Sequence, residues 1–180
     1  MSLSKFRLSF VAALVFTGLG LSACGFTPLY GRTGSSAQVV GQLATIDVRP
    51  IPDRVGQMMR TELKRRLSIN RPQGPAQYKL TVTLSEGIAQ LAVEQSAFAT
   101  RANLHLSSSF NLVRTSDGLE VTKGSPSTVA SYNILSSDFA TQTARADARE
   151  RAVIGLAQII NQRLSVYFLA GDRSTGTPEQ

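Results

Sequence analysis

The stretch "YKLTVTLSEGIAQLAV" (78–93) decides the fold, because its first half alternates strictly between two kinds of side chain. The even positions from Tyr78 to Leu84 are apolar, whereas the odd positions from Lys79 to Ser85 carry charged or hydroxyl groups. A period of two residues is typical of a β-strand that buries one face and leaves the other in water. The sequence therefore predicts a sheet with one covered face.

Two further strands are expected downstream of this one. Residues 99–115 repeat the alternation, and an Asp-Gly dipeptide at 117–118, which is a strong hairpin signal, follows them. Residues 119–134 have the composition of another strand, but Gly124 and Pro126 interrupt it. Because proline cannot donate to a central ladder, this strand is expected to be bulged or to lie at an edge of the sheet.

One more strand and two helices complete the pattern. Residues 44–51 alternate as a strand, and residues 54–69 carry apolar side chains at helical spacing, with Asp53 as the expected N-cap. A longer helix is expected over 139–168. The order β-α-β-β-β-α predicts an α+β fold, a two-layer sandwich in which a four-stranded mixed sheet packs against two helices. The order of the strands within the sheet stays open.

The N-terminal segment has the features of a lipoprotein signal peptide. After a short basic start, the apolar run over residues 8–21 has the length of a signal-peptide core and falls short of the roughly 20 residues that span a membrane. The run ends in Leu-Ser-Ala-Cys at 21–24, which matches the bacterial lipobox. Residues 1–23 are therefore expected to be removed, and Cys24 to become the acylated first residue. A plain export signal with an incidental cysteine is the alternative.

The cysteine count agrees with acylation, because Cys24 is the only cysteine and has no partner for an internal disulfide. Two or three acyl chains, such as diacylglycerol and palmitate, hold a protein firmly on a membrane without crossing it. Inner-membrane lipoproteins usually carry Asp after the cysteine, so Gly25 points to the outer membrane. The expected organisation after the leader is a lipidated tether over 24–41, a single α+β domain over 42–170 and a disordered tail over 171–180.

Charge and composition restrict the possible functions. The formal charge is +7, and loss of Lys5 and Arg7 with the leader leaves about +5, which favours an anionic partner such as lipid phosphate. No nucleic-acid partner is expected outside the cytoplasm. The one histidine, His105, alternates with apolar residues and belongs to the polar side of its strand, and no G-x-S-x-G or phosphate-binding loop occurs. We therefore expect no catalytic residue, no metal and no cofactor.

The segment "CGFTPLYG" (24–31) after the lipobox, the strand "YKLTVTLSEGIA" (78–89), the element order and the mature length together resemble the LptE family of lipopolysaccharide-assembly lipoproteins, in its alphaproteobacterial form. The resemblance implies a protein on the periplasmic side of the outer membrane, partly inside the barrel of its partner LptD. It further implies that the protein assists barrel assembly, binds lipopolysaccharide and helps deliver it. Among binding residues only Cys24 carries over, because 89–100 is mostly apolar or neutral where the family has basic residues.

Basic residues concentrate in the first helix and its exit, where positions 54–71 hold six of the seventeen basic residues that remain after the leader. Arg60, Lys64 and Arg65 are the candidates for binding lipopolysaccharide phosphate, since guanidinium groups suit phosphate well. The alternative is an ordinary solvated helix face, whose last-turn cations are favoured by the helix dipole.

Residues 87–99, "GIAQLAVEQSAFA", are apolar on both faces near a hairpin tip, where a loop should be polar. Ile88, Leu91 and Phe98 are the candidates for contact with a partner, because exposed apolar patches mark interaction sites. Burial of this tip under the second helix is the alternative. Another periplasmic lipoprotein, such as a pilotin-like chaperone or a structural envelope protein, is the competing function, and fold alone does not separate the two.

Overall fold

A computed structural model of the chain describes residues 34–68, 75–91 and 101–175. The chain divides into two compact units, Met1–Gly31 and Arg32–Gln180, and all described residues belong to the second. The expected signal peptide, Cys24 and Phe98 lie outside the described residues, so the predictions made for them stay predictions.

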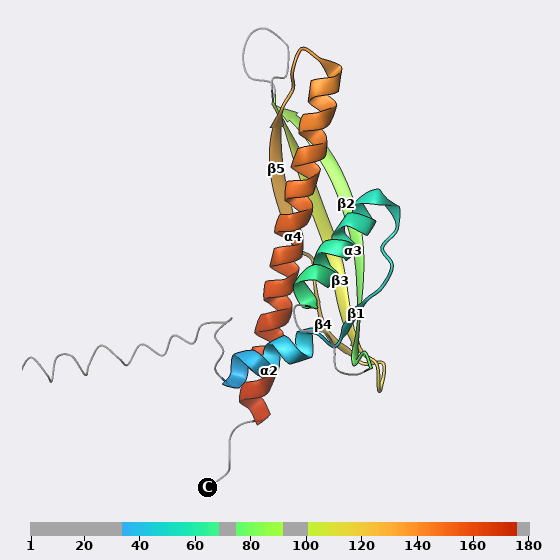
Figure 1. Ribbon diagram of the computed structural model, residues 1–180, viewed down its shortest axis with the longest axis vertical. Coiled ribbons are helices and arrows are strands. Elements are labelled where there is room, and N and C mark those ends of the chain that lie inside the picture. Colours follow the sequence, from blue (N-terminus) through green and yellow to red (C-terminus); the bar gives the residue numbers. More distant parts are fainter. Residues whose placement is uncertain (1–33, 69–74, 92–100, 176–180) are drawn as a thin grey trace, which may run out of the picture. The chain divides into compact units, whose positions relative to one another are not determined.

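The described unit alternates helices and strands in an α+β arrangement (Figure 1). Its elements are α2 (Gly34–Leu43), β1 (Ile46–Val48), α3 (Asp53–Leu67), β2 (Tyr78–Leu91), β3 (Arg101–Arg114), β4 (Glu120–Gly124), β5 (Ser127–Asn133) and α4 (Asp138–Thr175). The α+β class and the mixed sheet packed against helices are confirmed. The sheet has five strands where four were expected, and the described residues contain a third helix.

The sheet is mixed because one of its pairs is parallel. β1 pairs with β2 in parallel and α3 connects them, so these elements form the βαβ crossover that parallel neighbours require. β2 and β3 pair antiparallel along all fourteen residues of each strand. β4 and β5 share the other edge of β3, with β4 beside its C-terminal half and β5 beside its N-terminal half.

The expected strand over 119–134 is two strands, because the chain leaves the ladder at its Ser-Pro dipeptide. The backbone N–H of Ser108 donates to the carbonyl of Pro126 at 2.9 Å, which bridges the break. Gly124 ends β4 against the Phe110 ring, and an added Cβ would lie 2.9 Å from that ring. The break thus falls at the two residues that interrupted the sequence pattern, as their chemistry dictates.

The turn between β3 and β4 forms as expected. Gly118 adopts φ +70°, in the left-handed region that glycine occupies without steric cost. The Asp117 carboxylate accepts a hydrogen bond from the Leu119 N–H at 3.2 Å and pairs with Arg114 at 3.0 Å.

Helix boundaries differ from expectation at three places. Asp53 begins α3 with φ +65° and its side chain makes no capping hydrogen bond, so it is not the expected N-cap. α4 continues to Thr175, beyond residue 170. Residues 34–41 of the expected tether belong to α2, whose Val39 and Leu43 are buried in the core.

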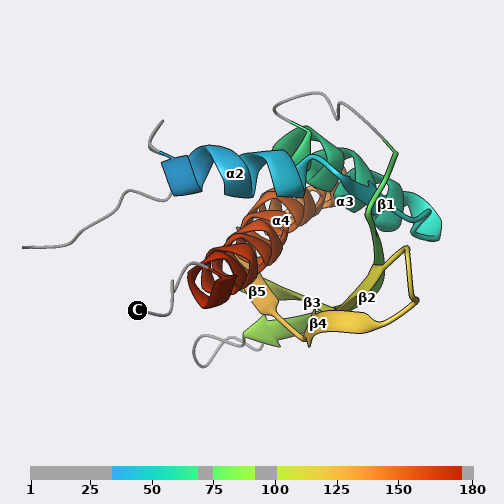
Figure 2. The ribbon, with the colours of Figure 1, turned by 90° about the horizontal axis from the view of Figure 1, so that it is seen from below.

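All three helices lie on one side of the sheet (Figure 2). α4 lies across β3 and β5 and contributes a buried stripe from Ala148 to Phe168, while α2 and α3 pack against α4. The even-numbered side chains of β2 and β3 form the opposite wall of the core, as the alternation predicted. α4 is long and apolar enough to cross a membrane, but half of its most apolar window is buried within the fold, as in a core helix.

Candidate functional surfaces

Helix α3 positions the predicted basic residues, because Met59, Leu63 and Leu67 bury one stripe of the helix and Arg60, Lys64 and Arg65 lie off that stripe. Arg60 lies beside that stripe, and its Nε donates to the backbone carbonyl of Val48 at 3.1 Å. This hydrogen bond ties α3 to the end of β1. Arg60 thus has a structural contact whatever else it binds.

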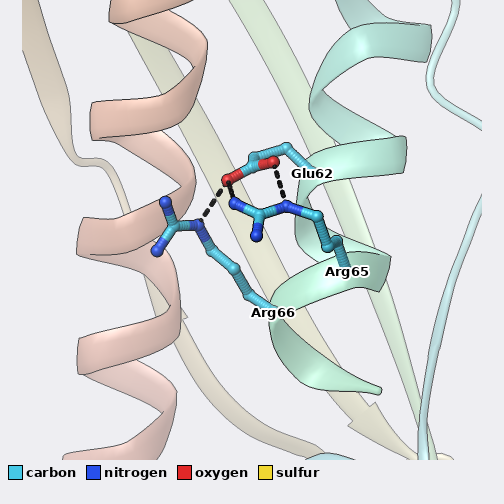
Figure 3. A network of polar contacts seen from close by, with 3 residues as sticks. All are labelled: Glu62, Arg65 and Arg66. Carbon is cyan, nitrogen blue, oxygen red and sulfur yellow. Dashed lines mark hydrogen bonds and ion pairs between the residues drawn. The ribbon is translucent and has the colours of Figure 1, made fainter. Parts of the chain in front are cut away.

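Arg65 shares one carboxylate with Arg66 (Figure 3). Arg65 donates to both oxygens of Glu62, through Nε at 2.8 Å and Nη2 at 2.6 Å, and Arg66 Nε donates at 2.7 Å. The Arg65 hydrogen bond, followed by the effects of Arg66, holds the pKa of Glu62 below its usual value although partial burial opposes this. The same contact raises the pKa of Arg65. One carboxylate between two guanidiniums leaves a net single positive charge.

Lys64 lies on another side of the helix from this cluster. It is exposed and borders a hollow of about 340 Å³ between α3 and the turn that leads into β1, together with Thr45, Asp47 and Ser68. Within the described part of the chain it makes no ion pair. The structure therefore does not bring the three predicted residues to one point: Arg60 faces β1, Lys64 this hollow, and Arg65 Glu62.

A groove of about 440 Å³ runs between α3 and α4. Met58, Val153 and Ile154 supply its apolar part, and Arg54 and Glu150 supply opposite charges. It combines an apolar surface with one exposed cation that sequence reasoning did not single out as a site.

Among the predicted partner-contact residues, the structure describes Ile88 fully, near the C-terminal end of β2. Ile88 is opposite Leu104 on the inner face of the sheet, yet it is 37% exposed whereas Leu104 is fully buried. The domain's own helices therefore leave Ile88 partly uncovered. The side chains of Leu91 and Phe98 lie outside the described residues, so the choice between partner and own core stays open for them.

Sequence reasoning missed an ion cluster next to Ile88. Glu86 occupies an inner, even position of β2, and Arg149 of α4 grips both its oxygens at 2.7 Å through Nε and Nη2. Arg145 approaches more loosely, with Nη2 at 3.5 Å, and its Nε is buried without a hydrogen bond. The sequence did contain a signal for this cluster, because Glu86 occupies an apolar position of an alternating strand, and a carboxylate there needs a cationic partner.

Glu86 and Arg149 shift each other's pKa, and both shifts favour the charged form. The hydrogen bond from Arg149 is the main cause that lowers the pKa of Glu86, and partial burial opposes it. Glu86 in turn raises the pKa of Arg149. Glu86 and Arg149 therefore both stay charged at neutral pH, and their ion pair is suited to hold α4 on the sheet and not to transfer protons.

The described residues include no group of three or more His, Cys, Asp or Glu side chains placed to hold a metal ion. His105 is exposed on the polar side of β3, as expected. It pairs across the sheet with Gly87 and Val129, neither of which can act with it as an acid or a base.

Solved structures with this arrangement of helices and sheet include several small bacterial lipoproteins. A candidate lipoprotein from Caulobacter crescentus CB15 is 26% identical, with a TM-score of 0.62, over 77% of this chain and 99% of its own. The minor lipoprotein from Acinetobacter baumannii has a TM-score of 0.56 at 18% identity, over 67% of this chain and 90% of its own. Rare lipoprotein B from Shewanella oneidensis has a TM-score of 0.55 at 14% identity, over 71% and 96%. The fold is therefore one found in small lipoproteins.

The family is given by the sequence itself. The model of the LptE lipopolysaccharide-assembly family matches residues 43–164, which is more than half of the chain. The chain belongs to the LptE family, and is thus a lipopolysaccharide-assembly lipoprotein of the cell envelope. The resemblance noted in the sequence is confirmed. No curated protein sequence matches the chain.

Proposed function

We propose that this protein is a non-enzymatic lipoprotein of the outer membrane that docks in an LptD-type barrel and assists the transport and assembly of lipopolysaccharide. The observation that carries the proposal is the family match, which spans the folded unit from the end of α2 to the last turns of α4. A pilotin-like or purely structural role has no comparable support. The domain is expected on the periplasmic side, partly inside the barrel.

The membrane anchor in this proposal is Cys24. Acylation converts the lone thiol into a thioether, and two or three chains at about 0.8 kcal/mol per buried CH₂ hold the protein on the membrane. Mass spectrometry of the mature N-terminus should find a diacylglyceryl cysteine at position 24. Cys24→Ala should accumulate as an uncleaved or soluble form, and an unmodified Cys24 in the membrane fraction would contradict the anchor.

Docking is tested by recovery of the barrel. The full-length chain, tagged at its C-terminus and extracted from outer membranes in mild detergent, should bring LptD down with it. The apolar tip contributes Ile88, Leu91 and Phe98 to the contact in this proposal, so Ile88→Asp combined with Phe98→Asp should weaken recovery while the circular dichroism spectrum is kept. Loss of the spectrum would instead assign the tip to the domain's own core.

Lipopolysaccharide phosphate is the proposed ligand of the basic side of α3. Lys64 is without an ion pair in the described structure, and Arg65 has only a share of Glu62, so both have capacity to bind an anion. Changing Lys64 and Arg65 together to Gln should reduce affinity for lipopolysaccharide about tenfold, since a well-placed charge-assisted bond contributes about 1.5–3 kcal/mol.

The matched control removes two cations from the sheet, Lys79→Gln with Lys123→Gln, and should leave affinity unchanged. Arg60→Gln is measured separately, because it also breaks the hydrogen bond to Val48. Equal affinities for the helix and sheet variants, with no dependence on salt, would show that α3 is only a solvated face.

A further inference from the structure

The sheet has a long open edge along β2. β1 pairs with only the first three residues of β2, Tyr78–Leu80 (Figure 1). Beyond them, over Val82–Gln90, the side of β2 that faces away from β3 has no strand neighbour within residues 34–68, 75–91 and 101–175. We call this stretch the open edge. Among the described helices, α3 packs against β1 and α4, while α4 packs against β3 and β5.

The backbone groups on the open edge belong to the even-numbered residues. The Tyr78 N–H donates to the carbonyl of Thr45, and the Leu80 carbonyl accepts from the Arg49 N–H at 3.0 Å, so even positions of β2 point away from β3. The same parity applies from Val82 to Gln90, and the described part of the chain supplies no hydrogen bond to these outward groups. An extended strand is the structure that offers matching donors and acceptors at this spacing.

The margins of the sheet formed by β1 and β5 are protected. β1 has three residues and is followed by Pro50, and Arg60 caps the carbonyl of its last residue, Val48, at 3.1 Å. At the opposite margin, Arg151 Nη2 donates at 3.2 Å to the carbonyl of Ser131, on the side of β5 that faces away from β3. Short strands, prolines and charged side chains are the usual means by which sheets prevent further pairing.

The open edge lacks this protection, whereas β4 has it. β4 carries an exposed ion pair between Lys123 and Glu120 along its five residues. The nine residues from Val82 to Gln90 include no Pro, Lys or Arg, and their one charged side chain, Glu86, is already bound by Arg149. β2 is therefore the strand of this sheet that remains suited to accept a further strand.

We propose that the open edge pairs, antiparallel and about a two-fold axis, with the open edge of a second copy of this chain. Head-to-tail pairing of β2 with β1, β4 or β5 of another copy is opposed by the protection of those strands. Pairing of β2 with β2 is isologous, so it closes at two copies and builds no fibre. All nine residues from Val82 to Gln90 pair when Glu86 lies on the axis.

The side chains of the open edge complement each other in this register. Leu84 lies opposite Ile88 of the second copy on the inner face of the sheet. Leu84 is half-buried and Ile88 is 37% exposed, so pairing covers apolar surface that the single domain leaves in water. Thr83 lies opposite Ala89 on the outer face, where both are exposed and small enough for the strands to approach closely.

The two copies of Glu86 meet at the axis, where like charges would repel each other. Each copy also brings Arg149, which binds its own Glu86 at 2.7 Å, and Arg145 at 3.5 Å, so four guanidinium groups offset two carboxylates. Nine paired residues span only about 30 Å, which makes a small interface and a dimer that exchanges with monomer. The inference does not rest on the proposed docking, and the dimer is a form of the protein outside the barrel.

The first test removes one outward N–H group from the open edge. The purified full-length chain, in mild detergent and without LptD, should dimerise with rising concentration in sedimentation equilibrium. Ile88→Pro keeps the bonds to β3, because proline is tolerated where the N–H of an edge strand points outward. The two-fold symmetry removes two hydrogen bonds, so the dissociation constant should be at least about tenfold higher than for Ile88→Ala.

Ile88→Ala is the matched control, because it removes the same side chain and keeps the N–H group. Circular dichroism checks that both variants are folded. A wild-type chain that stays monomeric at every concentration, or a folded Ile88→Pro that dimerises as tightly as Ile88→Ala, would overturn the inference.

The second test does not depend on how well proline is tolerated. Odd positions across the open edge form pairs without hydrogen bonds, whose Cα atoms lie about 4.5 Å apart, a distance that a disulfide can bridge. Thr83→Cys combined with Ala89→Cys should therefore give a covalent dimer on mild oxidation that reductant dissolves. Wild type, and Thr83→Cys combined with Gln158→Cys on the exposed side of α4, should stay monomeric under the same conditions.

The remaining outcomes of the cysteine test are decisive as well. If Thr83→Cys with Ala89→Cys gives no covalent dimer, or no more than the Gln158→Cys control, the two open edges do not pair. If oxidation in living cells links these cysteines to another protein instead, the open edge receives a foreign strand and the inference is wrong. Recovery of LptD is measured separately, so a failure of the docking proposal leaves the dimer result unaffected.

Discussion

The two halves of the interface between α4 and the sheet differ in the side chains that they bury. In the half that includes residues 156–168, large side chains such as Leu156, Ile160 and Leu164 are fully buried against the strands. In the other half, residues 144–152, the buried side chains are Ala148 and Ala152, and the ion cluster of Glu86 takes the place of further apolar packing. We refer to these as the leucine half and the alanine half.

The difference shows how stability and position are divided along one helix. Large apolar side chains supply most of the free energy of burial, at about 25 cal/mol per Å². Alanines supply little, but they let the helix approach the sheet closely, and a bidentate Arg–carboxylate pair fixes orientation. The leucine half therefore stabilises the fold, and the alanine half sets where the N-terminal part of α4 lies relative to β2.

The largest effect is expected from Leu164→Ala in the leucine half. Leu164 is fully buried, so its loss removes apolar burial and leaves a cavity, which should lower the free energy of unfolding by about 2–5 kcal/mol. Chemical denaturation measures this. Ile154→Ala, at a 39% exposed site on the same helix, is the matched control and should cost far less. Equal losses in the free energy of unfolding for the two variants would show that Leu164 contributes no more to stability than an exposed residue of α4.

A smaller loss is expected from Glu86→Gln in the alanine half. The change leaves Arg149 and Arg145 partly buried without their carboxylate, and hydrogen bonds to charged groups contribute about 1.5–3 kcal/mol. We expect a loss of about 1–3 kcal/mol at pH 7 in denaturation. Glu150→Gln removes an exposed carboxylate from α4 and should be nearly neutral. A neutral Glu86→Gln would mean that the alanines alone hold this half.

Acid should weaken the alanine half through the same carboxylate. The pKa of Glu86 is lower in the folded state than in the unfolded chain, where it is about 4.3. Its stabilisation is therefore fully present above that value and is lost as pH falls through the folded pKa. Denaturation from pH 7 to pH 3 should show a shallower decline for Glu86→Gln than for wild type. If the free energy of unfolding fell equally with pH in both proteins, Glu86 would not contribute to the pH dependence of stability.

The smallest effect is expected from Arg145→Met. Arg145 reaches Glu86 only at 3.5 Å and has a buried Nε without a hydrogen bond, so methionine replaces an imperfect ion contact by apolar packing. The free energy of unfolding should change by less than about 1 kcal/mol. Arg149→Met, by contrast, should cost about as much as Glu86→Gln. If Arg145→Met cost more than Arg149→Met, Arg145 and not Arg149 would make the main contact with Glu86.

The regular parts of this fold were predictable because each has a local physical cause. Alternation gave the inner face of β2 and β3, the Asp-Gly pair gave the turn at Gly118, and helical spacing gave α3 and α4. The division of β4 from β5 was signalled by Gly124 and Pro126, but a sequence pattern cannot tell a bulge from a break. The helix over 34–43 was missed because a segment rich in Gly and Ser resembles a linker.

The candidate sites were less predictable, because they depend on contacts between distant residues. Glu86 and Arg149 are 63 positions apart, and no local pattern links them. The predicted basic residues share one helix, yet Arg60 bonds to Val48 and Arg65 to Glu62. Helical spacing predicts the face of the helix on which a side chain lies, but not the residue that it contacts in the folded protein.

β3 has a strand neighbour on each side, which affects how its backbone amides exchange with solvent. Its amides point to β2 on one side and to β4 or β5 on the other, whereas β1 has only three residues paired, on one side, with β2. Amide hydrogens in β1 can reach solvent when that short strand frays, but those of β3 need the sheet to come apart. Deuterium uptake should therefore be fast in β1, and slowest in β3, where it reports the opening of the whole domain.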